Sequence, residues 1–130
     1  MYREITRNIE VTAKPSYLPE QSNPENGRYF WAYTIEIENQ GEKTVTLLSR
    51  HWVITDGEGK IQEVKGDGVV GEQPSLAPGS SFTYTSGCPL TTPQGIMAGS
   101  YLFTTEEGEL FPVKIPAFSL DLPQAKRVLH

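Results

Sequence analysis

Residues 29–38, YFWAYTIEIE, decide the fold of this 130-residue chain. The odd positions hold Tyr29, Trp31, Tyr33, Ile35 and Ile37, and the even positions include Thr34, Glu36 and Glu38. Such alternation puts apolar side chains on one face of a β-strand and polar side chains on the other. The stretch therefore predicts a strand with one inner and one outer face, and it leads into a turn at residues 39–42.

The preceding segment shows the same alternation. Apolar side chains occupy odd positions at Ile5, Ile9 and Val11, with polar residues at the even positions from residue 4 to residue 12. We therefore expect one strand here, with these three side chains on its inner face.

The segment after the turn, TVTLLSRHWVIT, changes its alternation once. Val45 and Leu47 occupy odd positions, whereas Trp52 and Ile54 occupy even positions. One extra residue in an otherwise regular strand has this effect, so we expect a β-bulge near Leu48–Arg50.

Further strands follow between turns rich in glycine and proline. The turns are Asp56-Gly57-Glu58-Gly59, Pro78-Gly79 and Glu106-Glu107-Gly108-Glu109. The strands are residues 60–65, the segments around Phe82 and Tyr84 and around Tyr101 and Phe103, and a last strand with Phe111, Val113 and Ile115. Pro112 and Pro116 indicate that the last strand lies at a sheet edge.

No segment shows a helical period, and the sequence indicates about seven short strands. Together these features predict an all-β fold. It is an antiparallel β-sandwich of the immunoglobulin or fibronectin type III kind. We expect a single domain over residues 1–130, with its core at about 3–120 and a loosely held tail at 121–130.

The charge pattern excludes several partners. The formal net charge of −5 disfavours nucleic acid and anionic membrane surfaces. Residues 73–105 carry no charge, but they contain four prolines and many Ser and Thr residues, so they do not form a membrane span. The charged start, MYREITRNIE, is not a signal peptide, and the single Cys88 cannot form an internal disulfide. We expect a cytoplasmic protein.

Residues 66–71, GDGVVG, match the G-x-G-x-x-G spacing of dinucleotide-binding loops. Those loops need a helix after the motif to hold the pyrophosphate, whereas the sequence that follows here is EQPSLAPGSS. A kinase-type loop needs a valine where Gln73 stands and a lysine on a following strand, yet residues 66–113 contain no Lys or Arg. The glycines therefore indicate special backbone geometry.

A ligand-binding role for this loop is the alternative. The connection from residue 66 to residue 80 is long for a compact domain, and such loops often carry function. Its candidate ligand-binding residues are Gly66, Asp67, Gly68 and Gly71. The ligand would be a divalent cation, or pyrophosphate or a nucleotide.

No catalytic set is evident elsewhere. His51, Cys88 and the terminal His130 do not supply a usual zinc ligand set, and we interpret His51 and Cys88 as structural. The acidic turns at Glu106–Glu109 and Asp56–Glu58 suit Mg²⁺ chemically, but solvated acidic turns are the simpler interpretation. We predict no enzymatic activity and no cofactor.

The sequence resembles the ApaG family over most of its length. The positions that carry the resemblance are His51-Trp52, Asp56-Gly57, Val64, Gly66, Gly68, Val69, Val70, Gly71, Gln73-Pro74, Leu76, Pro78-Gly79, Phe82, Tyr84, Ser86, Thr92-Pro93, Gly95, Met97, Gly99 and Tyr101. The resemblance implies a fibronectin type III-like sandwich and a small bacterial cytoplasmic protein associated with cobalt resistance and magnesium efflux.

The same resemblance bears on function. Related domains occur in some eukaryotic F-box proteins and in a protein that interacts with a DNA polymerase, and the family name implies a gene neighbourhood with diadenosine tetraphosphate hydrolysis. Our leading hypothesis is a non-enzymatic protein-interaction module with an indirect role in Co²⁺ and Mg²⁺ homeostasis. Its protein partner is unidentified, and the exposed sheet edges also allow a homodimer.

Overall fold

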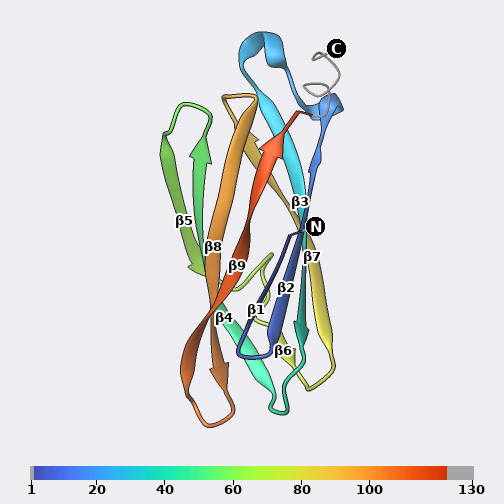
Figure 1. The fold of residues 1–130 in the computed structure, drawn as a ribbon, viewed down its shortest axis with the longest axis vertical. Helices are drawn as coiled ribbons and strands as arrows, with labels where there is room; N and C mark the ends of the chain where they lie inside the picture. The colour runs from blue at the N-terminus through green and yellow to red at the C-terminus, as the bar shows by residue number, and fades with distance from the viewer. Residues whose placement is uncertain (1, 123–130) are drawn as a thin grey trace.

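The computed structural model describes residues 2–122 and forms an antiparallel β-sandwich, as the sequence predicts (Figure 1). One sheet has the order β1-β2-β3-β7, and the other has the order β5-β4-β8-β9, with β6 paired to β4. The strands are β1 (Tyr2–Thr6), β2 (Ile9–Tyr17), β3 (Tyr29–Asn39), β4 (Val45–Asp56), β5 (Ile61–Asp67), β6 (Ser75–Leu76), β7 (Ser81–Leu90), β8 (Gln94–Thr105) and β9 (Leu110–Asp121). Two short 3-10 helices, η1 (Pro19–Gln21) and η2 (Pro24–Asn26), connect β2 to β3.

The core lies between the two sheets and comes from alternate positions of the long strands. In β3, Trp31, Ile35 and Ile37 are buried while Glu36 is exposed, so the predicted alternation of YFWAYTIEIE is confirmed. The aromatic side chains of Tyr33 and Trp52 meet across the sheets, with ring centroids 5.2 Å apart. This burial of apolar surface is the main favourable term in folding.

The prediction of one strand over residues 4–12 is wrong. β1 and β2 form a hairpin that turns at Arg7 and Asn8, whose φ angles are 47° and 66°. Ile5 pairs with Glu10 on the outer face and is 53% exposed. A two-residue turn with two positive φ angles fits the strand twist, but here it carries no glycine that would signal it.

The predicted bulge in β4 is confirmed. Against β8, Leu47 pairs with Phe103 and Ser49 pairs with Leu102, so Leu48 is the extra residue. The bulge changes which positions face the core, and this is why Leu47 and Trp52 are both buried.

The edge position of the last strand is also confirmed. β9 pairs only with β8 in the sheet order, and its register shifts near Pro116, where a residue without an N–H fits an irregular pairing.

The described part has nine strands where the sequence indicates about seven. β9 continues through Asp121, so the tail expected at 121–130 begins within a strand, and residues 123–130 lie outside the described part. No helix in residues 2–122 has the length and apolar character to cross a membrane.

Candidate functional site

The glycine motif lies where β5 ends and the chain crosses toward β6. Gly66 and Asp67 are the last residues of β5, and Val69 and Glu72 then pair with each other across a tight turn. In this turn the Val69 amide donates to the Glu72 carbonyl at 2.8 Å, and the Glu72 amide donates to the Val69 carbonyl at 2.9 Å. No helix follows, so the backbone lacks the amide cluster with which a helix N-terminus holds phosphate.

Gly68 has a conformation that suits glycine. Its φ is +64°, and a Cβ atom there would collide with the backbone carbonyl of Glu72. Gly71 has a φ of +82° but open space around it, so glycine suits this position for its backbone conformation and not for its small size. These features agree with the backbone interpretation of the motif.

The loop closes over the bulge of β4. The Leu48 carbonyl, displaced from the regular ladder, accepts hydrogen bonds from the Gly68 amide at 2.8 Å and from Gln73 Nε2 at 2.9 Å. The Leu47 amide donates to the Pro74 carbonyl at 3.0 Å. The loop therefore satisfies backbone groups that the bulge would otherwise leave without partners.

Arg50 reaches the same loop from β4. Its Nη1 atom donates to the carbonyls of Asp67 at 3.1 Å and Gly68 at 2.9 Å. Gly66 makes room for this side chain, because a Cβ there would lie 2.9 Å from the guanidinium nitrogens. Sequence reasoning missed Arg50, although the tight turn at Asp56–Gly59, extended back along the hairpin, places Arg50 opposite Gly66.

The structure therefore brings three of the four candidate ligand-binding residues together at Arg50, while the fourth, Gly71, lies in the turn beyond them. Gly66, Gly68 and Asp67 frame the Arg50 guanidinium, whose contacts in the loop are to carbonyl oxygens. The exposed side chains of the loop include two carboxylates, Asp67 and Glu72. A phosphate group would meet these carboxylates, and the ligand-binding role of the loop stays a prediction.

The predicted structural roles of His51 and Cys88 agree with their surroundings. His51 Nε2 lies 2.7 Å from Glu63 Oε1 on the neighbouring strand. The Cys88 side chain is buried, and desolvation raises the pKa of its thiol to about 11. His51 follows the outward face of β4, next to the buried Trp52, so its side chain lies across the sheet from the core that holds Cys88.

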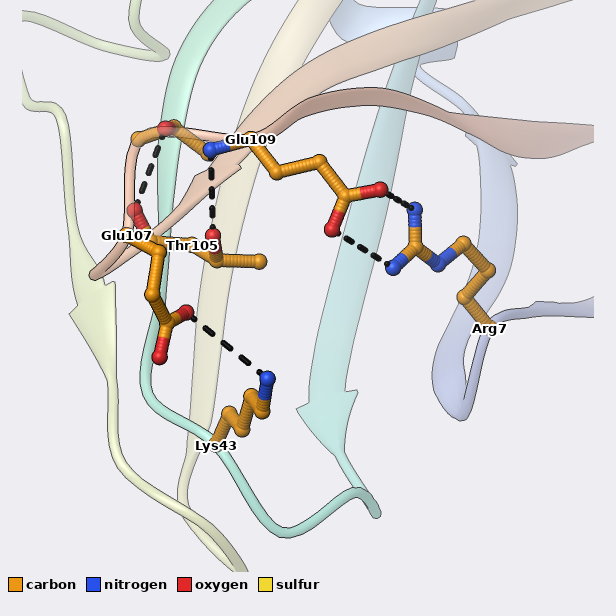
Figure 2. Close-up of polar contacts among 6 residues, drawn as sticks. Arg7, Lys43, Thr105, Glu107 and Glu109 are labelled. Atoms are coloured by element: carbon orange, nitrogen blue, oxygen red, sulfur yellow. Dashed lines mark hydrogen bonds and ion pairs between the residues drawn. The ribbon is translucent and has the colours of Figure 1, made fainter.

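The acidic turn between β8 and β9 is paired with basic residues from the β1–β2 turn and from the β3–β4 connection (Figure 2). Arg7 donates to both carboxylate oxygens of Glu109, at 3.0 and 3.1 Å, and this hydrogen bonding lowers the pKa of Glu109. Lys43 lies 3.7 Å from Glu107. Within residues 2–122, no group of three or more His, Cys, Asp and Glu side chains is placed to hold a metal ion.

Three tyrosines, Tyr33, Tyr84 and Tyr101, place their hydroxyl groups inside the sandwich near Arg50, and sequence reasoning missed this group. The hydroxyls of Tyr84 on β7 and Tyr101 on β8 hydrogen-bond to each other across the two sheets. The Tyr33 side chain forms a hydrogen bond with Ser86. Desolvation raises the pKa of all three phenols above the ordinary value, and the positive charge of Arg50 lowers it by a smaller amount.

We expect the tyrosine group to make folding stability depend on alkaline pH. Unfolded phenols ionise near pH 10, whereas the folded pKa values of Tyr84 and Tyr101 are higher. The unfolded state therefore loses protons first, and the free energy of unfolding falls as the pH rises above about 10. Urea unfolding between pH 8 and pH 11.5 measures this, with 295 nm absorbance reporting phenolate. An unchanged midpoint across that range would contradict the expectation.

The two hydroxyls of the Tyr84–Tyr101 pair are expected to be coupled, so that the stability costs of removing each one alone add up to more than the cost of removing both. Tyr84→Phe leaves the Tyr101 hydroxyl buried without its partner, a loss of about 1–3 kcal/mol. In the double variant Tyr84→Phe/Tyr101→Phe no hydroxyl is left over, so its cost is smaller than the sum of the two single costs. Urea unfolding of all four proteins gives the coupling energy, and simple additivity would show that the pair is not coupled.

The fold and this site define a class of protein: a two-sheet antiparallel β-sandwich whose glycine-rich loop covers a bulge in a core strand. A family model described as ApaG domain matches residues 19–105. The chain belongs to the ApaG domain family.

Individual relatives agree with the family assignment. The chain is 61% identical over 130 residues to "Protein ApaG" of Rhodopseudomonas palustris strain TIE-1 and 58% identical to that of Xanthobacter autotrophicus, with 100% of both chains covered in each case. It also resembles the crystal structure of a Bordetella pertussis protein described as ApaA. The TM-score is 0.87 at 52% identity, covering 89% of this chain and 94% of that one.

Proposed function

We propose that this ApaG domain protein is a non-enzymatic protein-interaction module with an indirect role in Co²⁺ and Mg²⁺ homeostasis. The observation that carries the proposal is the edge strand β7. Ser81–Leu90 contains no charged residue, and among the strands of residues 2–122 β7 pairs only with β3. Its outer row of backbone N–H and C=O groups is therefore available to another chain.

The other edge strands differ from β7 in this respect. β5 carries Glu63, Lys65 and Asp67, and β1 is a five-residue strand with Arg3 and Glu4. β9 has Pro112 and Pro116, and it also packs against β1 and β2. Charge, short length and proline are the usual protection against pairing with a second chain. β7 has the least of it, since it is uncharged over ten residues and its one proline, Pro89, stands near its end.

The state of Cys88 and of His51 supports a non-enzymatic role. The Cys88 thiol stays protonated at neutral pH because burial raises its pKa to about 11, and a protonated thiol is a poor nucleophile. The Nε2 atom of His51 is already engaged in a hydrogen bond with the Glu63 carboxylate. A cytoplasmic location fits both a free thiol and this role.

Affinity capture with edge variants tests the proposal. Thr83 on β7 is exposed and lies opposite Glu36, so Thr83→Lys adds a charge to the edge without burying it. Ala117→Lys makes the same kind of change on the exposed part of β9. We expect the wild type and Ala117→Lys to enrich the same protein from an extract of the cells that express this chain, and Thr83→Lys to lose it. Failure of the wild type to enrich any protein would contradict the interaction function.

A further inference from the structure

Three hollows meet at the end of β7, and Pro89 lines all of them. The first, about 450 Å³, lies against Tyr29 and Phe30. The second, about 210 Å³, opens between the sheets beside Trp52 and Val64. The third, about 250 Å³, reaches Ile61 of β5. Figure 1 shows the β4–β5 hairpin, the β7–β8 turn and the η1–η2 segment at the same end of the sandwich.

The two sheets are closed on one side and open on the other. β9 packs against β1 and β2, and this closes one side. On the other side, β5 and β7 face each other across the second hollow, which Gln62 and Val64 line from β5 and Ser86, Gly87 and Cys88 line from β7. An extended segment laid along β7 would point every second side chain into this space.

The charge of the lining indicates the chemistry of such a segment. Arg28, Arg50 and Lys60 line the hollows, and Asp56 is the one acidic residue among the lining residues. Asp56 keeps its charge, but amides of its own turn, those of Glu58 and Lys60, hold its Oδ1 atom, and the three cations outnumber it. In a chain with a net charge of −5, this is a locally basic surface.

The two exposed cations of the lining carry the complementarity. Arg28 and Lys60 are exposed, and no ion pair joins either of them to a carboxylate within residues 2–122. Glu25 and Glu58 stand on the adjoining turns without lining a hollow. Acidic side chains of a docked segment would find their opposite charges here, and apolar side chains would find Trp52, Leu90 and Tyr29.

We propose that the edge of β7 and the three hollows around Pro89 form a docking groove for an extended segment of a partner protein, in which apolar residues alternate with acidic ones. The inference rests on the proposed interaction function and names its surface and the chemistry of its partner. Backbone pairing along Ser81–Cys88 supplies affinity, and the hollows and cations supply specificity. A second copy of this chain fits less well, because two such grooves would bring Arg28 and Lys60 of both copies together.

A peptide titration of the full chain tests the groove. The probe is a blocked decapeptide in which valine and leucine alternate with aspartate and glutamate, and its control carries lysine at every acidic position. Added to the ¹⁵N-labelled protein at up to 2 mM, the acidic peptide should shift the amides of Ser86, Thr91 and Gln62 saturably and slow amide exchange in β7. The lysine peptide should bind at least tenfold more weakly.

Matched charge variants locate the effect. The double variant Arg28→Glu/Lys60→Glu should bind the acidic peptide at least tenfold more weakly. Lys14→Glu/Lys114→Glu changes the net charge equally on exposed positions outside the groove, and it should bind like the wild type. Equal binding of the two peptides, equal weakening in both variants, or no saturable shift at the groove would overturn the proposal. So would concentration-dependent dimerisation that shifts the same amides without peptide.

The two proposals can fail separately. If the affinity capture enriches the same partner with the wild type and with Arg28→Glu/Lys60→Glu, the interaction function stands and the groove is wrong. If the wild type enriches no protein and the acidic peptide produces no shift, both are wrong.

Discussion

Replacement of Gly99 by alanine is expected to remove a large part of the folding stability of this protein. Gly99 lies in β8 opposite Trp52 of β4, where the two backbones come close. A Cβ atom at Gly99 would overlap the His51 carbonyl oxygen and lie 3.2 Å from the Trp52 Cα. These atoms belong to a central strand, so they move only if the β4–β8 pairing opens. We expect a loss of about 4 kcal/mol, a large part of the 5–15 kcal/mol that keeps a typical domain folded.

Urea unfolding followed by tryptophan fluorescence measures the Gly99→Ala effect. Gly66→Ala is the matched control, because its Cβ would meet only the far end of the Arg50 side chain, which can move away. We expect the control to lose about 1 kcal/mol. If Gly99→Ala does not fold, amide NMR will show poor dispersion for it and good dispersion for the control. Equal midpoints for Gly99→Ala and the wild type would refute the close approach.

The second large effect is expected from Gly68→Val in the glycine loop. Valine is strained at the positive φ of Gly68, its Cβ would collide with the Glu72 carbonyl, and the hydrogen bond from residue 68 to Leu48 would be distorted. We expect a loss of about 3 kcal/mol from these combined effects. Thermal unfolding by circular dichroism measures it.

Gly71→Ala separates the two reasons for glycine in this loop. Gly71 also has a positive φ, but nothing lies within 4 Å of the added Cβ, so only conformational strain of about 1 kcal/mol applies. If the loop is instead built to bind a ligand, Gly68→Val should abolish ligand binding while the stability of the protein is unchanged. Titration of both variants with Mg²⁺, Co²⁺ and pyrophosphate, beside the unfolding curves, distinguishes these outcomes.

Much of the fold follows from side-chain alternation. The buried face of β3, the bulge at Leu48 and the edge position of β9 were all readable, because each follows from parity or from proline. The first hairpin was not readable. The alternation of apolar and polar residues continues through the turn at Arg7 and Asn8, and antiparallel pairing there inverts the faces, so Ile5 points away from Ile9.

The candidate site was less readable than the fold. The G-x-G-x-x-G motif was readable, and the lack of Lys or Arg in residues 66–113 argued against phosphate as its ligand. Arg50 enters the loop from another strand, and pairing between strands is set by register, which a linear search for charges does not follow. The Tyr84–Tyr101 pair and the hollows at Pro89 depend on how the sheets stack, and the sequence contains no local signal for them.

The contact between the first hairpin and the last one affects how the chain is made in the cell. Arg7 bonds Glu109 and its guanidinium lies 4.3 Å from the centroid of the Phe111 ring, while β9 covers β1 and β2. The ribosome makes the chain from its N-terminus, so the inner faces of β1 and β2 are expected to stay uncovered until β9 has been synthesised. Premature pairing of this first hairpin is the hazard of that interval.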